Sequence, residues 1–221
     1  MKKLFIAATL LLASVSLAQA QSGFGIRAGG NLSNLSGDLK NEERYENKVG
    51  FHAGAFINFP VTEGFFSIQP ELIYSQKGFK NSEVEFTDLL GGEYKRTGKV
   101  NYNYLDLPVL AKINAGPLYF EGGPQASYLL NVNNETKEYY NGNLQSSSTT
   151  ERDKDGLQEF ELGYVAGVGF ATTSGISLGV RYNGSFSDFV KTDSDQYFNG
   201  DLGNAKHSTI MLTLGFKLSG N

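Results

Sequence analysis

Histidine is the residue type whose ordinary pKa lies nearest neutral pH, and the sequence has two, His52 and His207, so acid–base chemistry would centre on them. A histidine acts as a general base in hydrolysis when a serine and an orienting carboxylate lie beside it. No fixed motif places those two groups beside either histidine. We therefore assign no catalytic residue. We expect His52 to be a hydrogen-bonded interior residue and His207 to be a solvated residue at the rim of the fold.

The stretch ERDKDG at residues 151–156 imitates the start of a calcium-binding loop, with acidic groups at alternate positions followed by glycine. Such a loop needs a glutamate at its twelfth position, which here is Leu162, and flanking helices that the sequence does not predict. A solvated acidic loop is therefore the main interpretation, and a loose cation contact is the alternative. The acidic and aromatic stretch at 187–201 implies no ligand geometry, so we expect no metal and no cofactor.

Charged residues also occur within segments that alternate between apolar and polar residues, as SIQPELIYSQKG at residues 67–78 illustrates. Ile68, Leu72 and Tyr74 fall on one side of an extended chain and Glu71 on the other, which is the period of a strand with two unlike faces. Eight charges lie on the polar faces of such segments, four basic and four acidic: Arg27, Glu71, Asp106, Lys112, Glu121, Glu161, Arg181 and Lys217.

Eight alternating segments position these charges, and none of them shows a sustained helical period. Their apolar faces carry no charged residue, although 19 % of the chain is charged. Lipid against these faces explains the absence, because a Lys or Arg at the bilayer midplane costs about 2–4 kcal/mol. The predicted strands are 23–33, 49–60, 65–77, 102–114, 117–130, 160–172, 175–187 and 207–218.

The connections between these strands alternate in length. Tight turns are expected at 61–64, 115–116 and 173–174, and long polar loops at 34–48, 78–101, 131–159 and 188–206. In an antiparallel meander, odd and even connections lie at opposite ends. Short turns at one end and long loops at the other are typical of outer-membrane barrels, with the long loops extracellular.

The N-terminus and the composition narrow the class further. Residues 1–20 read as a secretory signal peptide, which leaves a folded domain over 21–221. The chain has no cysteine, which excludes a disulfide framework, and its net charge of −4 argues against a nucleic-acid surface. No apolar run of about 18 residues follows the signal peptide, so no helical span is expected. The transmembrane structure that remains is a closed barrel.

The lumen of an eight-stranded barrel is just wide enough to be filled by its own side chains. Charges packed there must pair, because an unpaired ion away from water is very costly. The equal numbers of basic and acidic residues suit such pairing, so we interpret the eight charges as a structural network in the lumen. Pro70, Pro108 and Pro124 fit less well because proline lacks a ladder donor, and we expect β-bulges or strand margins there.

The aromatic residues of the apolar faces predict the orientation of the barrel, because aromatic girdles mark both membrane interfaces. The tyrosines expected at the long-loop end, outside the cell, are Tyr74, Tyr128, Tyr164 and Tyr182. The phenylalanines expected at the short-turn, periplasmic end are Phe24, Phe59, Phe66, Phe120, Phe170 and Phe216.

Several stretches of the sequence carry a resemblance to a known family: GIRAGGNLSNLSGD, FFSIQPELIYSQKGFK, YLDLPVLAK, GPLYFEGGPQASYLL, and the closing GISLGVRYNGSFSD and STIMLTLGFKL. They resemble the outer-membrane β-barrel (porin-like, PorT-type) family common in Bacteroidetes, in order and over nearly the whole of residues 21–221. The resemblance implies an all-β, eight-stranded, antiparallel up-and-down transmembrane barrel in the outer membrane. The family has no shared catalytic motif to carry over.

Two functional hypotheses therefore stand. The first is a non-enzymatic outer-membrane barrel, either structural or presenting its loops to an extracellular ligand or protein, with membrane lipid as its other partner and a monomeric state. The second is a small porin-like transport channel, which side-chain filling of the lumen disfavours. A soluble, lipocalin-like ligand-binding barrel is a third alternative, and it would turn the apolar faces inward.

Overall fold

The computed structural model describes residues 22–37, 45–87, 91–191, 202 and 204–219, with the backbone alone for 82–84. The predicted signal peptide at residues 1–20 lies outside these ranges. The described residues form nine strands: β1 (Gly23–Gly37), β2 (Tyr45–Thr62), β3 (Phe66–Thr87), β4 (Glu93–Ala115), β5 (Leu118–Tyr140), β6 (Asn143–Arg152), β7 (Phe160–Ala171), β8 (Ile176–Ser185) and β9 (Ala205–Ser219).

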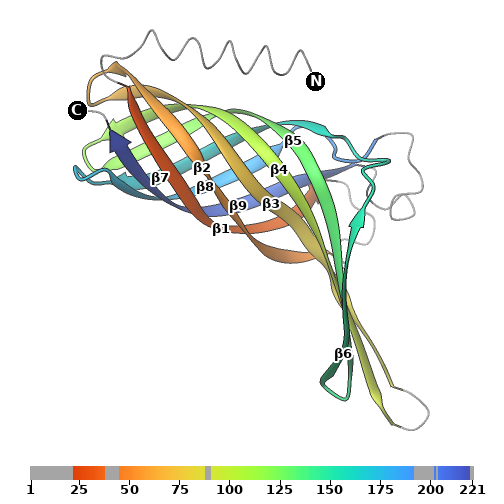
Figure 1. Ribbon diagram of the computed structural model, residues 1–221. Helices are drawn as coiled ribbons and strands as arrows, with labels where there is room; N and C mark the ends of the chain where they lie inside the picture. The colour runs from red at the N-terminus through yellow and green to blue at the C-terminus, as the bar shows by residue number, and fades with distance from the viewer. Residues whose placement is uncertain (1–21, 38–44, 88–90, 192–201, 203, 220–221) are drawn as a thin grey trace.

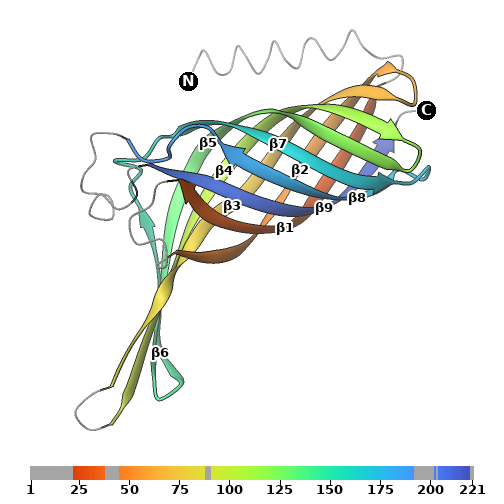
Figure 2. The ribbon, with the colours of Figure 1, turned by 180° about the vertical axis from the view of Figure 1, so that it is seen from behind.

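Eight of these strands close into an antiparallel barrel (Figures 1 and 2). Strand β1 pairs with β2 on one side and with the last strand, β9, on the other, so the ring has no open edge. Strand β5 pairs with both β4 and β7, which leaves β6 outside the ring and attached to the outer part of β5. The predicted all-β, eight-stranded up-and-down barrel is confirmed.

Three short turns join strands at one end of the barrel, close to the predicted positions. They are residues 63–65, 116–117 and 172–175. Gly64 and Gly116 have φ angles of +68° and +65°, in the left-handed region that a glycine enters without steric cost. These turns therefore reverse the chain within a few residues and hold adjacent strands in antiparallel register.

Side chains alternate between the lumen and the outside along the barrel strands. The predicted apolar faces point outward; Leu214, for example, is 57 % exposed and Phe120 is 52 % exposed. The predicted charged faces point into the lumen. This arrangement is the reverse of a soluble lipocalin-like barrel, so that alternative is wrong. Among the described residues, no helix has the length and apolarity needed to cross a membrane.

Two of the predicted long loops are in fact paired strands. Residues 78–101 continue β3 and β4 as a hairpin, and residues 131–159 continue β5 to Tyr140 and return as β6. Asn141 and Gly142 connect β5 to β6 with φ angles of 47° and 78°. An Asn-Gly pair with both φ angles positive is the commonest two-residue hairpin turn. The sequence did not predict these strands, because they are rich in polar and charged residues and so have the composition of a loop.

These extensions together form a four-stranded antiparallel sheet, which we call the projecting sheet. It contains residues 78–87 of β3, 93–102 of β4, 131–140 of β5 and all of β6. The projecting sheet leaves the long-loop end of the barrel sideways rather than along the barrel axis (Figure 1). Its outer face continues the outward side of the barrel wall, and its inner face continues the lumen side.

The three prolines lie in mid-strand, so the expectation of bulges or strand margins is wrong. Pro70 pairs with Val109 on β4, and Pro124 pairs with Tyr164 on β7. The register shifts of β3, β4 and β5 occur elsewhere; beside Pro70, Pro108 and Pro124 the ladders skip adjacent pairs and resume in the same register. The missing donors therefore interrupt pairing locally and leave the strand alignment unchanged.

The aromatic residues sort less cleanly than predicted. The predicted phenylalanines lie toward the short-turn end of their strands, but the long-loop end mixes tyrosine with phenylalanine. Phe51 lies 5.7 Å from Tyr74 and Phe186 lies 4.9 Å from Tyr164, both measured between ring centroids. The separation into a tyrosine ring and a phenylalanine ring thus holds at one end of the barrel.

Candidate functional site

The lumen near the short-turn end holds a carboxylate between two guanidinium groups. Glu71 Oε1 lies 3.0 Å from Arg27 Nη1, and Glu71 Oε2 lies 2.8 Å from Arg181 Nη1. Arg181 also donates from Nε to Glu121 Oε1. All four side chains are buried, and they reach the centre from β1, β3, β5 and β8. Charge-assisted bonds thus cross the lumen and connect distant strands.

A second polar cluster lies nearer the long-loop end. Lys77 Nζ is 3.1 Å from Asp106 Oδ1 and 4.7 Å from the centre of the Tyr104 ring. Tyr104 donates its hydroxyl to Glu161, and the Nδ1 atom of His207 lies 3.1 Å from the Oε1 atom of the same carboxylate. The two clusters place polar groups at successive levels of the lumen.

The eight predicted charges are therefore not one network. Arg27, Glu71, Glu121 and Arg181 form the first cluster, while Asp106 and Glu161 belong to the second. The remaining two, Lys112 and Lys217, are half-buried near the short-turn end. Lys112 Nζ lies 4.0 Å from the centre of the Tyr119 ring.

Two buried lysines were missed, so the balanced count of four and four was incomplete. Lys77 lies on the lumen face of its strand, six residues beyond Glu71 and therefore at the same parity, which was a usable signal. Lys48 precedes the predicted strand at 49–60 and so fell outside it. Its ammonium lies 3.2 Å from Gln76 Oε1. Both lysine side chains are almost fully buried.

The histidines divide between a confirmed and a wrong prediction. His52 is buried in the lumen, with Nδ1 2.7 Å from Asn31 Oδ1 and Nε2 3.0 Å from Thr213 Oγ1, as predicted. His207 was predicted to be solvated, but it is buried because Glu161 binds it and the Phe189 ring lies 4.7 Å from it. The extension of β9 toward the long loops places His207 below the rim.

Apolar side chains close the lumen at its long-loop end. Phe189 and Val190 fold in from the connection after β8, and Leu157 folds in from the stretch that resembles a calcium loop. We call the whole cluster the apolar cap; its members are Leu35, Tyr45, Phe79, Val100, Tyr102, Tyr104, Leu129, Val132, Leu157, Phe189, Val190, Leu202 and Ala205. Such a cluster excludes water from the mouth of the barrel.

The stretch at 151–156 is the end of a hairpin. Glu151 and Arg152 are the last residues of β6, and the backbone then turns at Gly156, whose φ is +83°. Leu157 pairs with Val190 in an isolated bridge beneath it. In the described part of the chain, no three histidine or acidic side chains gather as a metal site would require.

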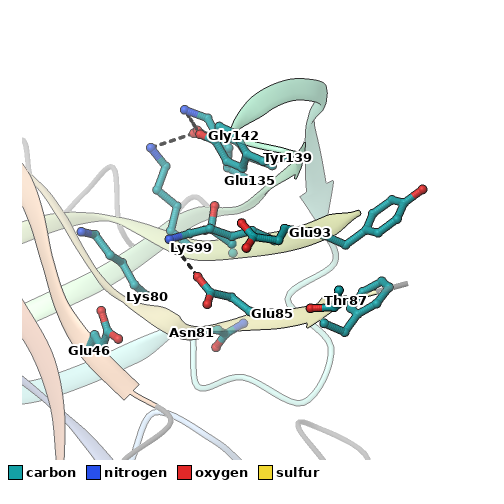
Figure 3. A pocket seen from close by; sticks show the side chains of 16 residues that line it. Glu46, Lys80, Asn81, Glu85, Thr87, Glu93, Lys99, Glu135, Tyr139 and Gly142 are labelled. Carbon is teal, nitrogen blue, oxygen red and sulfur yellow. Dashed lines mark ion pairs between the residues drawn. The ribbon is translucent and has the colours of Figure 1, made fainter. Parts of the chain in front are cut away.

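The outer face of the projecting sheet is hollowed into a groove of about 900 Å³ (Figure 3). Glu135 lies between two ammonium groups, 2.8 Å from Lys99 and 3.2 Å from Lys137. Hydrogen bonds from these lysines, led by Lys99, lower the pKa of Glu135. Toward the tip, Lys95 and Glu85 pair across the β3–β4 ladder at 3.4 Å. We call this hollow the outer groove.

Strand β6 forms an exposed edge of the projecting sheet. All ten of its residues are exposed, and eight successive residues, 143–150, carry no charge. Every second residue of an edge strand turns its backbone N–H and C=O away from the sheet. Proteins commonly blunt such edges with lysine, proline or short strand length, and the uncharged part of β6 contains neither residue.

Several solved structures are similar to the chain at low sequence identity. The chain is similar to Ail, the attachment invasion locus protein of Yersinia pestis, at 14 % identity over 90 % of this chain and 99 % of Ail, with a TM-score of 0.42. It is similar to OprG of Pseudomonas aeruginosa at 16 % identity over 91 % of this chain and 97 % of OprG, with a TM-score of 0.41. It is also similar to Neisserial surface protein A, at 16 % identity over 88 % and 97 % of the two chains, with a TM-score of 0.39.

No curated protein matches the sequence significantly. A family model does match, over residues 17–191, and its description is outer membrane protein β-barrel domain. The match covers most of the chain, from β1 through β8, and so includes the projecting sheet. The chain belongs to the outer membrane protein β-barrel domain family.

Proposed function

We propose that this outer-membrane barrel is a closed, non-enzymatic anchor that displays the projecting sheet to a protein partner outside the cell. The observation that carries the proposal is the contrast between a lumen filled along its length and strands that continue well beyond it. A transport role would use the lumen, and a display role would use the extension. In the described part of the chain, the lumen is filled and the strands continue into the projecting sheet, which favours the display role.

The filled lumen supports the closed state. Ion-paired side chains occupy the level of Glu71, a second polar cluster occupies the level of Asp106, and the apolar cap lies beyond both. An eight-stranded barrel is narrow enough for its own side chains to fill. Moving a charge out of either cluster would break buried pairs, which is costly.

The exposed edge of β6 supports a polypeptide as partner. A row of alternating backbone donors and acceptors is complementary to another extended chain, and this mode of binding is β-strand addition. The middle of β6, residues 146–150, carries small hydroxyl side chains; Ser146 and Ser147 lie opposite Glu138 and Lys137. Long side chains on β5 therefore flank the edge and would select the sequence of an added strand.

Finer features of the family resemblance belong to the same proposal. We assign the chain to the porin-like, PorT-type barrels common in Bacteroidetes, with a signal peptide at 1–20, a barrel domain at 21–221 and a monomeric state. No catalytic residue is assigned, since His52 and His207 are both committed to buried hydrogen bonds. The eight predicted charges have a structural role in the lumen. Six of them belong to the two polar clusters, and Lys112 and Lys217 lie near the short-turn end.

Planar-bilayer conductance tests the closed anchor. The purified barrel should show no stable openings, because both polar clusters and the apolar cap obstruct the lumen. Stable, large openings of the wild-type protein would overturn the proposal in favour of a channel.

Selection of a random-peptide phage library on the protein in nanodiscs tests the display role. Successive backbone N–H groups point to opposite sides of a strand, so one of Ser147→Pro and Ser148→Pro removes an outward donor. Selected peptides should lose binding to that variant and keep it for Ser147→Ala and Ser148→Ala, which retain every donor. Peptides indifferent to both prolines would show that the edge is not the recognition surface.

A further inference from the structure

The outer groove lies on a surface continuous with the lipid-facing side of the barrel. On β4, Leu105 faces lipid, and the alternation runs without a shift on that strand through Asn103 and Asn101 to Lys99. On β5, one extra residue at the register shift keeps Asn131 and then Glu135 on the same face. The lysines of the groove therefore stand directly above the lipid-facing band.

The projecting sheet bends toward the lipid-facing side of the barrel. Asn103 and Asn101 lie on the outer face, yet both are buried, at 4 % and 8 % exposure. At this level the sheet leaves the barrel sideways rather than along the barrel axis (Figure 1). Amide side chains fill the bend: Gln76 donates to Asn103 at 3.3 Å, and Asn103 donates to Asn131 at 2.6 Å. The groove thus opens sideways, beside the barrel wall.

The height of the groove matches a headgroup layer. Lys99 lies six residues beyond Leu105, or about 20 Å along a strand at about 3.3 Å per residue. For a strand tilted about 45°, this is about 14 Å along the membrane normal, and the bend reduces it further. A lysine can extend its stem and lower its ammonium toward the interface. Outer-leaflet headgroups therefore lie within reach.

The charge of the groove changes from its base to its tip. Among the described residues that line the base, Lys80, Lys99 and Lys137 stand with Glu46 and Glu135, which leaves a positive excess. At the tip, Lys95 stands with Glu85 and Glu93, which leaves a negative excess. Lys80 is exposed and makes no ion pair with a described residue (Figure 3). The end nearest the membrane is the one suited to an anion.

We infer that the base of the outer groove binds the phosphate-bearing headgroup of an outer-leaflet glycolipid through Lys80, Lys99 and Lys137. A phosphate monoester carries a charge of about −1.5 to −2 and three strong acceptor oxygens, which suit a groove base lined by three lysines. The half-buried amide of Asn133, on the same face as Glu135, offers donors and an acceptor to sugar hydroxyls. A headgroup is the occupant because the groove opens on the membrane flank.

Binding of bisphosphorylated lipid A to the detergent-solubilised protein, followed by native mass spectrometry, tests the inference. The double variant Lys99→Gln/Lys137→Gln should lower the affinity at least tenfold, and Lys80→Gln should lower it by a smaller factor. The same lipid without its phosphates should bind the wild-type protein no better than the intact lipid binds the double variant. Heat-modifiable migration in SDS gels should remain, since none of these side chains enters the lumen.

Arg96→Gln is the matched control, because Arg96 lies on the inner face of the same strand and is paired with Glu138 at 3.7 Å. It removes one positive charge from the projecting sheet and should leave the affinity for lipid A unchanged. Equal losses for Arg96→Gln and the lysine variants would show attraction by net charge alone and overturn the site. Full competition by inorganic phosphate would make it a free-anion site and also overturn the inference. Neither result concerns the conductance of the barrel or peptide binding at the β6 edge. The proposed function is therefore tested separately from this lipid site.

Discussion

The same arrangement, a carboxylate between two cations, occurs in two unlike regions of this protein. In the lumen, Glu71 lies between Arg27 and Arg181, with the side chains almost fully buried. On the projecting sheet, Glu135 lies between Lys99 and Lys137, with both lysines 38 % exposed. A buried ion that loses its partner has no water to replace it, whereas an exposed ion does. The surroundings, rather than the pairing, decide what each carboxylate contributes.

The contrast extends along individual strands. Strands β3, β4 and β5 each run from the barrel into the projecting sheet without a break in the chain. Their alternation of faces persists, but beyond the row formed by Gln76, Asn103 and Asn131 the outer face changes from apolar to charged. One set of strands thus serves lipid at one end and water at the other.

The largest expected effect comes from removing the carboxylate of each trio. Glu71→Leu leaves two buried guanidinium groups without a shared partner and should lower the free energy of unfolding by about 3–5 kcal/mol. Glu135→Leu should cost about 1 kcal/mol or less. Urea unfolding in lipid vesicles measures both. Losses of equal size would mean that the lumen is hydrated enough to behave like the surface.

Aromatic residues offer the second test of the same comparison. Phe189 is buried in the apolar cap, so Phe189→Ala should cost about 3–5 kcal/mol. Phe86 is exposed on the projecting sheet and stacks on Tyr94 with ring centroids 5.0 Å apart. Phe86→Ala should cost about 0.5–1.5 kcal/mol, the usual contribution of an aromatic pair. A Phe189 variant as mild as the Phe86 variant would show that the apolar cap is loosely packed.

The part of the fold that meets lipid was predictable, because lipid requires an uninterrupted apolar face. That requirement made the eight barrel segments and their inward charges visible in the alternation of residues. Outside the membrane a strand does not need an apolar face, so the outer half of β4, with Lys95, Lys99 and Asn103, has a sequence that resembles a loop. The Asn141-Gly142 turn was the signal that could have found the β5–β6 hairpin.

The pairing inside the lumen could not be predicted from alternation. Parity tells whether a side chain points in or out, but the stagger of the strands decides which inward residues share a level. Glu71 and Arg181 meet across 110 residues of sequence, and nothing in the alternation of either strand marks that pairing. His207 was misplaced for the same reason, since its depth depends on how far β9 extends.

The turn at Asn141-Gly142 provides a third, smaller effect. Gly142 has a φ of +78°, so Gly142→Ala should cost about 1 kcal/mol through the left-handed strain of alanine. The strain should loosen the β5–β6 hairpin and leave the barrel intact. Hydrogen exchange should therefore rise in β6 alone. Gly30→Ala is the control, since Gly30 faces outward in β1, its φ lies outside the left-handed region, and an added methyl group would meet open space.

The smallest expected effect is a titration on the projecting sheet. Lys99 leads the groups that lower the pKa of Glu135, so Lys99→Gln should raise that pKa toward the usual glutamate value of about 4.3. The pKa of Glu135 is lower in the folded protein than in the unfolded chain. The trio therefore stabilises the pairing of β4 with β5 at pH values above the unfolded pKa, and this contribution is lost as the pH falls through the folded pKa. The carboxyl carbon of Glu135, followed by NMR between pH 2 and pH 7 in labelled protein, reports both changes. Arg96→Gln on the opposite face should leave the titration unmoved; an equal shift there would mean that the whole charge of the sheet, rather than contact with Lys99, sets the acidity of Glu135.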